Sequence, residues 1–485
     1  MTLDRVGIVT RVILLGLLAA GGGVVSACGG SSPSTPTGPT TTGPVTPAAA
    51  LAIAGGANLQ SPGTSAQLLV TATPVGGTAA DVTARATWLS SNPAVATVTA
   101  GGLVTTVALG EATITATVDR QTANLAVEVQ SGSGPIASCG TFRGPGPFTL
   151  TGDIPQTAGL CAYFSGLADT VLDCQGHDIR SINVLSARNF TIRNCRVHGM
   201  IPNLVGEALQ NFRLQSGTGI LVEGIDVLGA ATIRNCDDCT IRGSTFVYPQ
   251  AGFTPGGGFV SGELVVTDGR NVTLTGNTVD GGWDGGTGAT YQRQGCDDGI
   301  LFHRTTGLRI EDNLIVNAFD AGIEPSAGDA PLTVVIRHNT IRRMGFTGIG
   351  AYYEWGFRDS VIAGNTVTDT PNLMHLDATG ASIADVTAIT FENNVIENNV
   401  LRSPVPRPPF YGGAMAPAIL IRYAPSSLPY AVSNNLVRGN DLGLNSPAPV
   451  LEPAAGFIDG GGNSCATGGV LACGGAAAGV TGGRR

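Results

Sequence analysis

Three aspartates are spaced so that they could act together on a glycosidic bond. Asp297 and Asp298 stand before the Gly-Ile pair at 299–300, and Asp320 stands before the Gly-Ile pair at 322–323. If these segments stack as neighbouring parallel strands, Asp297 and Asp320 lie about 5 Å apart. Two carboxylates at that distance do not both ionise readily, so one should have a raised pKa. Such a pair suits retaining glycoside hydrolysis, and a pair two coils apart suits inverting hydrolysis. We therefore interpret Asp297, Asp298 and Asp320 as candidate catalytic residues.

Aromatic and polar residues that suit sugar binding follow the same Gly-Ile pairs. Aromatic rings stack on the C–H faces of sugars, and carboxylates accept hydrogen bonds from hydroxyls. The candidate substrate-binding residues are His303, Arg304, Glu324, Tyr352, Tyr353, Glu354 and Trp355. Two other interpretations stay open: aspartates before glycine are common in turns, and an aspartate pair can hold Ca2+. No other cofactor is indicated.

The elements that must position these residues are short strands in a repeated pattern. Each repeat is an apolar-alternating strand, a turn with Asn, and a second short strand, as in 272–279, 308–315 and 334–341. Stacked parallel strands bring identical residues into one column, and Asn amides in such a column bond to each other. We predict one structural ladder, made of Asn277, Asn313, Asn339, Asn365, Asn394 and Asn435.

This repeat resembles the right-handed parallel β-helix proteins of the pectin-lyase-like superfamily. The resemblance implies a β-helix over 135–475 and a disordered tail over 476–485. Polysaccharide lyases and hydrolases, epimerases, phage tailspikes and non-enzymatic surface proteins share that fold. The Asp-Asp-x-Ile string at 297–300 is similar to that of polygalacturonases, but the Asn of their Asn-Thr-Asp string is missing at 266–269. Related lyases typically use a Lys or Arg base with Ca2+, and this chain has no Lys.

A different pattern precedes the repeats. Residues 50–130 contain short alternating strands, and the stretch from Trp88 to Val98 resembles bacterial Ig-like domains of group 2. We interpret Trp88 as a core residue and the segment as a spacer or adhesion module. The expected fold class is therefore all-β, a right-handed parallel β-helix solenoid plus a small Ig-like β-sandwich.

The first 49 residues carry targeting signals. Residues 1–27 have basic residues, an apolar run and small residues, as a secretory signal does. The end, Val25-Ser26-Ala27-Cys28, resembles a lipoprotein lipobox, which implies lipidation of Cys28; an ordinary signal peptide is the alternative. Residues 28–49 are a Pro/Thr/Ser/Gly linker. We expect the protein in the cell envelope, outside the cytoplasm, anchored to a membrane by lipid.

Composition and cysteine use agree with export. The net charge is −9, so nucleic acid is not an expected partner. Polysaccharide is the expected partner, and the chain is expected to be a monomer. We predict disulfides between successive coils and at the caps, with Cys296 left unpaired; the proposed pairs are Cys139–Cys161, Cys174–Cys195 and Cys465–Cys473. Cys236 and Cys239 are interpreted as a turn pair that is either bridged or free.

The predicted function is binding, and cleavage by carboxyl groups, of an extracellular polysaccharide. A non-catalytic cell-surface or adhesion protein is the first alternative. A calcium-dependent polysaccharide lyase is the second.

Overall fold

The computed structural model describes residues 50–465 and 471, apart from several interior segments. Those segments are 57–58, 60–62, 75–76, 109, 130–133, 145, 155–160, 200–210, 249–261, 284, 286–294, 327–331, 352–355, 378–388 and 423–428. The described chain is almost entirely β-structure, with short 3-10 helices η1 (Thr83–Arg85), η3 (Pro409–Tyr411) and η4 (Ala454–Gly456). None of its helices is long and apolar enough to cross a membrane.

The first described part is a small antiparallel β-structure. Its three sheets have the orders β1-β3-β4, β2-β7-β6 and β5-β8-β9. Trp88, predicted to be a core residue, is partly buried and packs against both apolar clusters of this part. The strands are β1 (Ala50–Ala54), β2 (Ser65–Gln67), β3 (Leu69–Thr73), β4 (Ala80–Asp81), β5 (Thr87–Ser90), β6 (Ala96–Val98), β7 (Leu103–Thr106), β8 (Gly110–Val118) and β9 (Gln121–Val129).

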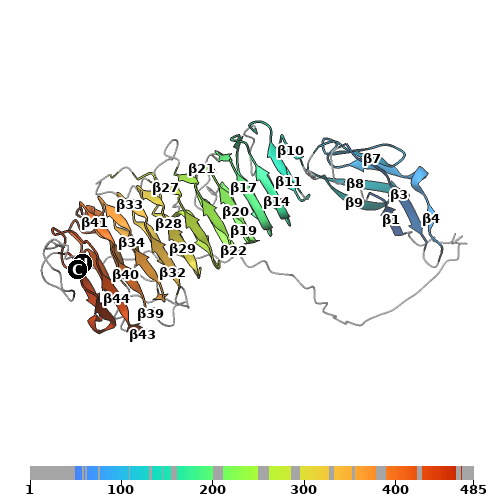
Figure 1. Cartoon of the computed structure of the whole chain (residues 1–485). Helices are drawn as coiled ribbons and strands as arrows, with labels where there is room; N and C mark the ends of the chain where they lie inside the picture. The colour runs from blue at the N-terminus through green and yellow to red at the C-terminus, as the bar shows by residue number, and fades with distance from the viewer. Residues whose placement is uncertain are drawn as a thin grey trace, which may run out of the picture. The chain divides into compact units, whose positions relative to one another are not determined.

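From residue 134 onward the chain winds as a parallel β-helix with three faces (Figure 1). Each coil passes through a strand of face 1, then face 2, then face 3, and returns to face 1 of the next coil. For example, β28 (Asp298–His303) is followed by β29 (Leu308–Glu311), β30 (Leu314–Val316) and β31 (Ala321–Ser326). The register pairs Ile300 of β28 with Ile323 of β31, as the Gly-Ile alignment predicts.

Faces 1 and 2 together form a 25-stranded sheet. Besides β28 and β31, face 1 contains β11 (Gly140–Phe142), β13 (Ala162–Ser165), β16 (Ile182–Leu185), β19 (Phe212–Thr218), β22 (Ala231–Asp237), β25 (Gly262–Thr267), β34 (Thr347–Ala351), β38 (Met374–Asp377), β42 (Ile419–Arg422) and β45 (Val450–Glu452). Besides β29, face 2 contains β10 (Gly134–Ile136), β12 (Phe148–Leu150), β14 (Ala168–Asp173), β17 (Arg188–Arg193), β20 (Leu221–Glu223), β23 (Thr240–Arg242), β26 (Thr273–Thr275), β32 (Val334–Arg337), β36 (Val361–Ala363), β40 (Val395–Glu397), β44 (Asn435–Arg438) and β46 (Phe457–Asp459).

Face 3 is a nine-stranded sheet, and a small three-stranded sheet is added near the C-terminal end. Besides β30, face 3 contains β15 (Asp178–Ile179), β18 (Arg196–Val197), β21 (Asp226–Leu228), β24 (Thr245–Val247), β27 (Thr278–Asp280), β33 (Thr340–Arg342), β37 (Thr366–Thr368) and β41 (Val400–Arg402). The small sheet contains β35 (Phe357–Arg358), β39 (Ile389–Glu392) and β43 (Tyr430–Ser433).

The core of the β-helix is built from apolar columns that run from coil to coil. Because alternate residues of a strand point to opposite faces, one residue in two points inward. On face 1, the inward residues Leu264, Ile300, Ile323, Ile349 and Met374 pair in successive strands and are fully buried. This column fixes which side chains of the same strands point outward.

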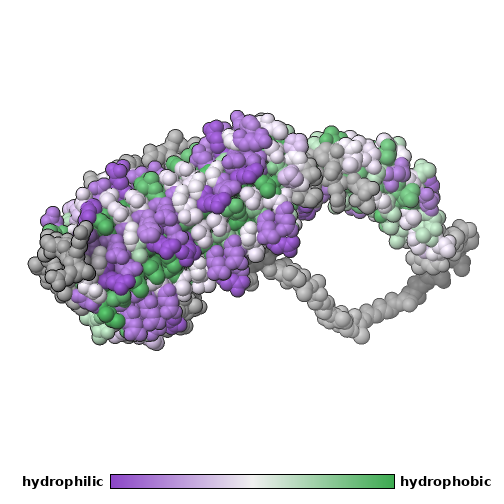
Figure 2. Space-filling model, in the orientation of Figure 1, coloured by the Kyte–Doolittle hydropathy of each residue, from purple (hydrophilic) through white to green (hydrophobic). Residues whose placement is uncertain are grey.

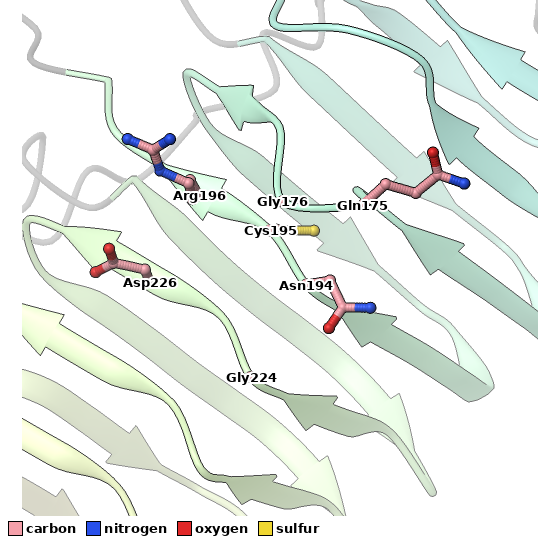
Figure 3. A pocket seen from close by; sticks show the side chains of 7 residues that line it. All are labelled: Gln175, Gly176, Asn194, Cys195, Arg196, Gly224 and Asp226. Carbon is pink, nitrogen blue, oxygen red and sulfur yellow. The ribbon is translucent and has the colours of Figure 1, made fainter.

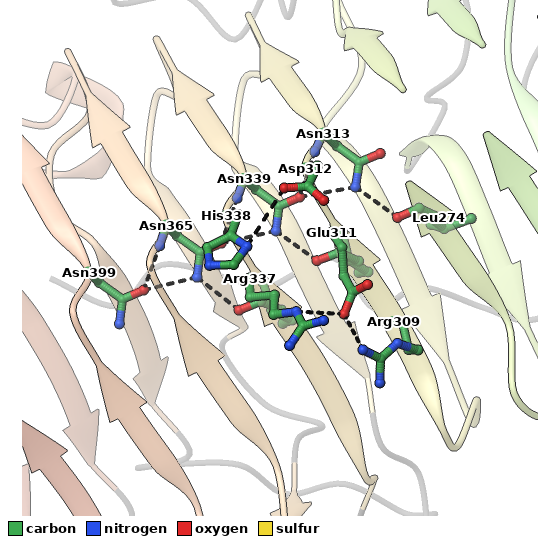
Figure 4. Close-up of polar contacts among 12 residues, drawn as sticks. Leu274, Arg309, Glu311, Asp312, Asn313, Arg337, His338, Asn339, Asn365 and Asn399 are labelled. Atoms are coloured by element: carbon green, nitrogen blue, oxygen red, sulfur yellow. Dashed lines mark hydrogen bonds and ion pairs between the residues drawn. The ribbon is translucent and has the colours of Figure 1, made fainter. Parts of the chain in front are cut away.

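Buried asparagines form ladders at the turns, as predicted, but there are two ladders rather than one; Figure 4 shows part of the first, from Asn313 to Asn399. The first runs through Asn277, Asn313, Asn339, Asn365, Asn399, Asn440 and Asn463, each amide bonding the next at 2.9–3.0 Å. Asn394 and Asn435, which we predicted in this ladder, form a separate one that starts at Ser360. The reason is that one coil contains two Asn-Asn turns, and only the second, with Asn399, lies above Asn365.

Charges of opposite sign alternate along the edge of face 2. The last residues of successive strands pair in register as Asp173, Arg193, Glu223 and Arg242, and the same alternation recurs from Glu311 to Arg337. Ion pairs of 2.5–2.8 Å join Arg193 to Asp173, Arg242 to Glu223 and Arg337 to Glu311. Hydrophilic patches accordingly interrupt the paler, less polar surface over the β-helix in Figure 2.

The cysteine predictions agree with the structure in the part that it describes. Disulfides join Cys139 to Cys161, Cys174 to Cys195 and Cys236 to Cys239. Cys296 is a buried free thiol. Cys465 is disulfide-bonded, and its predicted partner Cys473 lies outside the described residues.

Candidate functional site

The three candidate catalytic aspartates meet on face 1, at the N-terminal ends of β28 and β31. Asp298 opens β28, Asp297 directly precedes that strand, and Asp320 directly precedes β31. The backbone N–H of Asp320 donates to the carbonyl of Asp297 at 2.7 Å, which places these two residues in the same position of adjacent coils. The structure therefore brings together the aspartates that the Gly-Ile alignment pairs.

A glycine column allows these strand ends to lie close over the core. A Cβ on Gly299 would lie 2.4 Å from Ile315, and a Cβ on Gly322 would lie 2.5 Å from Ile341. Those distances are too short for real contacts, so a side chain at either position would push the strand outward. The glycine of each Gly-Ile pair thus sets how closely the acidic residues of neighbouring coils approach.

Asp298 and Glu324 form a hydrogen-bonded carboxyl pair, and this pair is the centre of the candidate site. The Asp298 side chain is 3% exposed, and its Oδ1 accepts the backbone N–H of Ala321 at 3.1 Å. Burial, then the charge of Glu324 and the hydrogen bond to it, then Asp320 and Asp297, raise the pKa of Asp298 well above its usual range. The raised pKa favours the protonated form of Asp298, which can donate to Glu324, a half-buried residue.

A second buried acid, which the sequence analysis missed, lies one coil before this pair. Glu263 on β25 is fully buried, and neither of its carboxyl oxygens has a hydrogen-bond partner among the described residues. Burial and, to a lesser extent, Asp280 raise the pKa of Glu263 well above its usual range. Glu263 is a charged residue in a strand, so the sequence suggests that it lies on the surface. Only the coils packed around it show that it is buried.

Cys296 and Tyr248 lie in the same buried region. The Cys296 thiol donates to the carbonyl of Asp298 at 2.9 Å. Burial, together with Glu263 and Asp298, raises the pKa of this thiol well above its usual range. Burial also raises the pKa of Tyr248 to about 12. Both groups are therefore neutral at physiological pH, and the thiol is not an activated nucleophile.

The candidate substrate-binding residues have different outcomes. Glu324 joins Asp298, as described above. His303 ends β28 and is half-buried, whereas Arg304 is exposed and its Nε pairs with Asp268 of the preceding coil at 2.6 Å. Arg304 is thus directed toward Asp268 instead of the carboxyl pair. Tyr352, Tyr353, Glu354 and Trp355 lie outside the described residues, so the aromatic platform predicted from them remains a prediction.

A different aromatic cluster lies next to the acids. Phe346 donates its backbone N–H to the carbonyl of Asp320 at 3.0 Å, and its ring centroid lies 4.8 Å from that of Tyr411. Phe319, the neighbour of Asp320, contacts Tyr411 at 5.7 Å and Trp283 at 6.2 Å between centroids. Trp283 and Tyr411 are half-buried, although the Tyr411 hydroxyl itself is buried.

Sequence reasoning missed this cluster because its members are far apart in the chain. Tyr411 comes from η3, in a loop between β41 and β42, about a hundred residues after the acids it accompanies. Loop side chains carry no periodic signal, so only the folded chain shows that Tyr411 reaches face 1. Half-buried aromatic residues beside carboxyl groups are suited to stacking on a sugar ring.

His375 and Arg407 border the aromatic cluster. The His375 ring packs on Phe346 at 4.6 Å between centroids, and Arg407 places its guanidinium carbon 4.4 Å from the centre of the Phe346 ring. An Arg407 nitrogen lies 2.7 Å from Nδ1 of His375. Asp298, Glu324, the aromatic rings and this His–Arg pair thus form one group on face 1.

A surface depression elsewhere has a different character (Figure 3). It lies over the turns that lead into β18 and β21, in the N-terminal coils. Its lining residues are Gln175, Gly176, Asn194, Cys195, Arg196, Gly224 and Asp226. The lining combines turn residues with a disulfide cysteine, and it contains neither a carboxyl pair nor an aromatic ring. We therefore place the candidate site on face 1.

The face 1 group can perform acid–base chemistry with its own side chains. It combines a carboxyl that is held protonated with further carboxyls, Asp297 and Asp320, that are only partly buried. Within the described residues, no three His, Cys, Asp or Glu side chains are arranged to hold a metal ion. Pairs of carboxyl groups whose surroundings separate their pKa values can divide acid and base roles between them.

The fold and the sequence together define the class of protein. Residues 160–356 and 294–465 match the family described as right handed beta helix region, and residues 61–129 match the bacterial Ig-like domain of group 2. The chain belongs to the right-handed β-helix family and carries an Ig-like module before the helix. No curated protein matches the chain in sequence.

Solved structures with the same fold are distant in sequence. A tailspike protein of the E. coli bacteriophage HK620 is 10% identical, with a TM-score of 0.35; the alignment covers 64% of this chain but only 60% of the tailspike. The A-module of the Azotobacter vinelandii mannuronan C-5 epimerase AlgE6 is 12% identical (64% and 89% covered, TM-score 0.34). The Streptococcus pneumoniae surface protein and adhesin PfbA is also 12% identical (64% and 82% covered, TM-score 0.34).

Proposed function

We propose that this protein binds an extracellular polysaccharide along face 1 and hydrolyses its glycosidic bonds. The observation that carries the proposal is the buried, hydrogen-bonded pair Asp298–Glu324, with Asp320 on the adjacent coil. The half-buried residues Trp283 and Tyr411, beside these acids, support sugar binding at the same place. Burying carboxyl groups costs free energy, so folding alone does not favour a buried pair that shares a proton.

The chemistry follows from the different surroundings of the carboxyls. Asp298 holds the proton, and Glu324, which is more accessible, passes it to the glycosidic oxygen as the carbon–oxygen bond breaks. An ionised Asp320 or Asp297 then acts on the opposite side, either as nucleophile or as the base that activates water. Water finally supplies a hydroxyl to the sugar carbon and returns a proton to the acid. General acid catalysis of this kind contributes about 10²–10⁴-fold.

A panel of soluble polysaccharides tests the proposal, with xylan and galactomannan as neutral members and alginate and polygalacturonate as acidic ones. We expect the wild type to release reducing ends from at least one. Glu324→Gln and Asp298→Asn should each lower that rate about 10²-fold or more. Glu397→Gln is the matched control, because Glu397 lies on face 2 in an ion pair with Arg438. Equal activity in all variants would reject the proposed acid.

A non-catalytic adhesion protein is the second candidate function. It is favoured by the Ig-like module at 61–129 and by the missing Asn of the polygalacturonase Asn-Thr-Asp string. It predicts binding without turnover, with affinities unchanged in Glu324→Gln and Asp298→Asn. A calcium-dependent lyase is a third candidate, for which ultraviolet-absorbing unsaturated products that disappear with a chelator would be diagnostic.

We also propose that the protein is exported and anchored by lipid at Cys28. The support is the sequence alone: the apolar leader, the lipobox-like end at 25–28 and the linker that follows. Residues 1–49 lie outside the described residues.

A further inference from the structure

His375 occupies the same outward column of face 1 as Glu324. The register pairs Gly350 with His375, and Ile323 with Ile349, so Glu324, Gly350 and His375 follow one another in adjacent strands. Neighbouring strands are about 4.8 Å apart, so the Cα atoms of Glu324 and His375 are about 10 Å apart. The residue between them has no side chain. His375 therefore borders the carboxyl pair across a gap one strand wide.

The contact with Arg407 fixes where the His375 ring carries its proton. A guanidinium group has only hydrogen-bond donors, so the Arg407 nitrogen 2.7 Å from Nδ1 must donate to it. A neutral imidazole that accepts at Nδ1 carries its proton at Nε2. The ring is held in place by Phe346 on one side, and Arg407 is held by the same Phe346 ring.

The charges around His375 oppose a second positive charge there. Arg407 approaches from the loop before η3, and Arg422 acts from the neighbouring strand β42. Asp377, on the same strand as His375, lies 4.0 Å from Arg422. The His375 side chain is 2% exposed. Burial first, then Arg407 and Arg422, lower the pKa of His375 to about 3.

We propose that Arg407 is a positioning residue that holds His375 as a neutral ring, with its proton on Nε2, so that it serves as an uncharged hydrogen-bond donor to a sugar oxygen at the carboxyl pair. The ligand-binding role rests on the proposed function, whereas the protonation state rests on the Arg407 contact. A neutral donor is useful at this position because a charged histidine would stabilise the ionised form of Glu324 and so reduce the fraction of that carboxyl that carries a proton.

Histidine-selective ¹⁵N NMR of the full chain tests the protonation state without a substrate. The chain has five histidines, and His375→Gln assigns the signal. In the wild type we expect the Nε2–H pattern, unchanged between about pH 5 and 8. In Arg407→Met no donor faces Nδ1, so we expect a mixture of the Nδ1–H and Nε2–H patterns, while burial and Arg422 still hold the ring neutral across that window. Arg358→Met, which removes a surface arginine paired with Glu392, should leave the wild-type pattern unchanged.

Two NMR results would overturn the proposal. One is a wild-type His375 that titrates in this pH window or carries its proton on Nδ1. The other is an Arg407→Met signal identical to that of the wild type. If Arg407→Met does not fold, Arg407→Lys retains the charge but not the fixed geometry, and should give a mixture of the two tautomers.

Binding measurements separate this proposal from the proposed function. With the panel polysaccharide that the wild type binds best, Arg407→Met should bind more weakly than the wild type, because only part of its His375 rings carry the proton on Nε2. Arg358→Met should bind like the wild type. If the variant's His375 shows both tautomers by NMR while its affinity equals that of the wild type, the donor role is wrong. Failure of every polysaccharide to bind would reject the proposed function and the donor role, while leaving the NMR result on the Arg407–His375 contact intact.

Discussion

Buried ionisable side chains on face 1 differ in how well their polar atoms are satisfied. Asp298 accepts the Ala321 N–H and pairs with Glu324, so its burial is compensated by hydrogen bonds. Glu263 is as deeply buried but has no hydrogen-bond partner among the described residues. A buried carboxyl without a partner is stable only when it is neutral. Glu263 should therefore make the stability of the fold depend on pH.

We predict that Glu263→Gln removes this dependence. The pKa of Glu263 is raised above the value of 4.5 that an unfolded chain would show. The folded state therefore binds the extra proton, and stability is full below about pH 4.5 and falls as pH rises through the folded pKa. The variant has no such proton, so its melting temperature should exceed that of the wild type by an amount that grows from pH 4.5 to 8. Thermal unfolding followed by circular dichroism measures this.

The exposed Glu111 provides a control for the prediction. Glu111→Gln should change the melting temperature little and by a constant amount across the same pH range. A melting-temperature difference for Glu263→Gln that does not vary with pH would show that Glu263 ionises inside the fold with a partner.

At the scale of single elements, two ladders fix how the coils stack. The Asn ladder satisfies backbone groups at the turns: the Asn339 side chain donates to the Ile310 carbonyl and accepts from the backbone of Asn313. The charge ladder on face 2 pairs each acid with an arginine of a neighbouring coil. A shift of one residue in a strand would turn its apolar column outward and break both ladders together. The apolar column, the Asn ladder and the charge ladder therefore each specify the correct stacking register.

We predict that Asn339→Ala destabilises the β-helix. The substitution leaves the Ile310 carbonyl and the Asn313 N–H without their partners in a buried turn. Each such loss costs about 1–3 kcal/mol, so we expect roughly 3 kcal/mol or more in total. Chemical unfolding measures the change.

The neighbouring Thr340 gives a matched control, because it is exposed on β33. Thr340→Ala should cost less than about 1 kcal/mol. Comparable losses in the two variants would mean that the ladder hydrogen bonds contribute little beyond strand propensity.

At the scale of the whole molecule, different segments carry different tasks. Each coil of a solenoid contacts mainly its neighbours, so a site on β28 to β38 depends on a few coils and not on the whole chain. The Ig-like module has its own apolar clusters and needs no contact with that site. The leader is separate again, since its proposed role is export and anchoring.

We predict that Cys28→Ser releases the protein from membranes. Several acyl chains on one cysteine hold a protein firmly, because each buried CH2 contributes about 0.8 kcal/mol. In cell fractionation the wild type should remain with the membranes and the variant should appear in the soluble exported fraction. Any activity per molecule should be unchanged, because Cys28 lies far along the chain from face 1. A variant that stays membrane-bound would exclude lipidation of Cys28 as the anchor.

The architecture could be predicted from the sequence because local sequence patterns determine it. Apolar alternation, repeated Asn turns and Gly-Ile pairs identify the strands and their stacking, and the Asp297–Asp320 pairing follows from the Gly-Ile register alone. The repeat also gives the disulfide Cys174–Cys195, since adjacent coils place those residues together. Only where one coil contains two Asn-Asn turns was the assignment wrong, because identical local patterns do not say which turn stacks on which.

The composition of the site was decided by the tertiary structure. Asp298, predicted as an alternative to Asp297 in a pair with Asp320, pairs with Glu324, because the burial and direction of a side chain at a strand end depend on neighbouring coils. Glu263, Tyr411, His375 and Arg407 carry no local signal that assigns them to face 1. They meet there because stacking and a long loop bring distant segments together. A periodic sequence thus determines the scaffold, whereas the contacts that set proton positions arise only when the chain is folded.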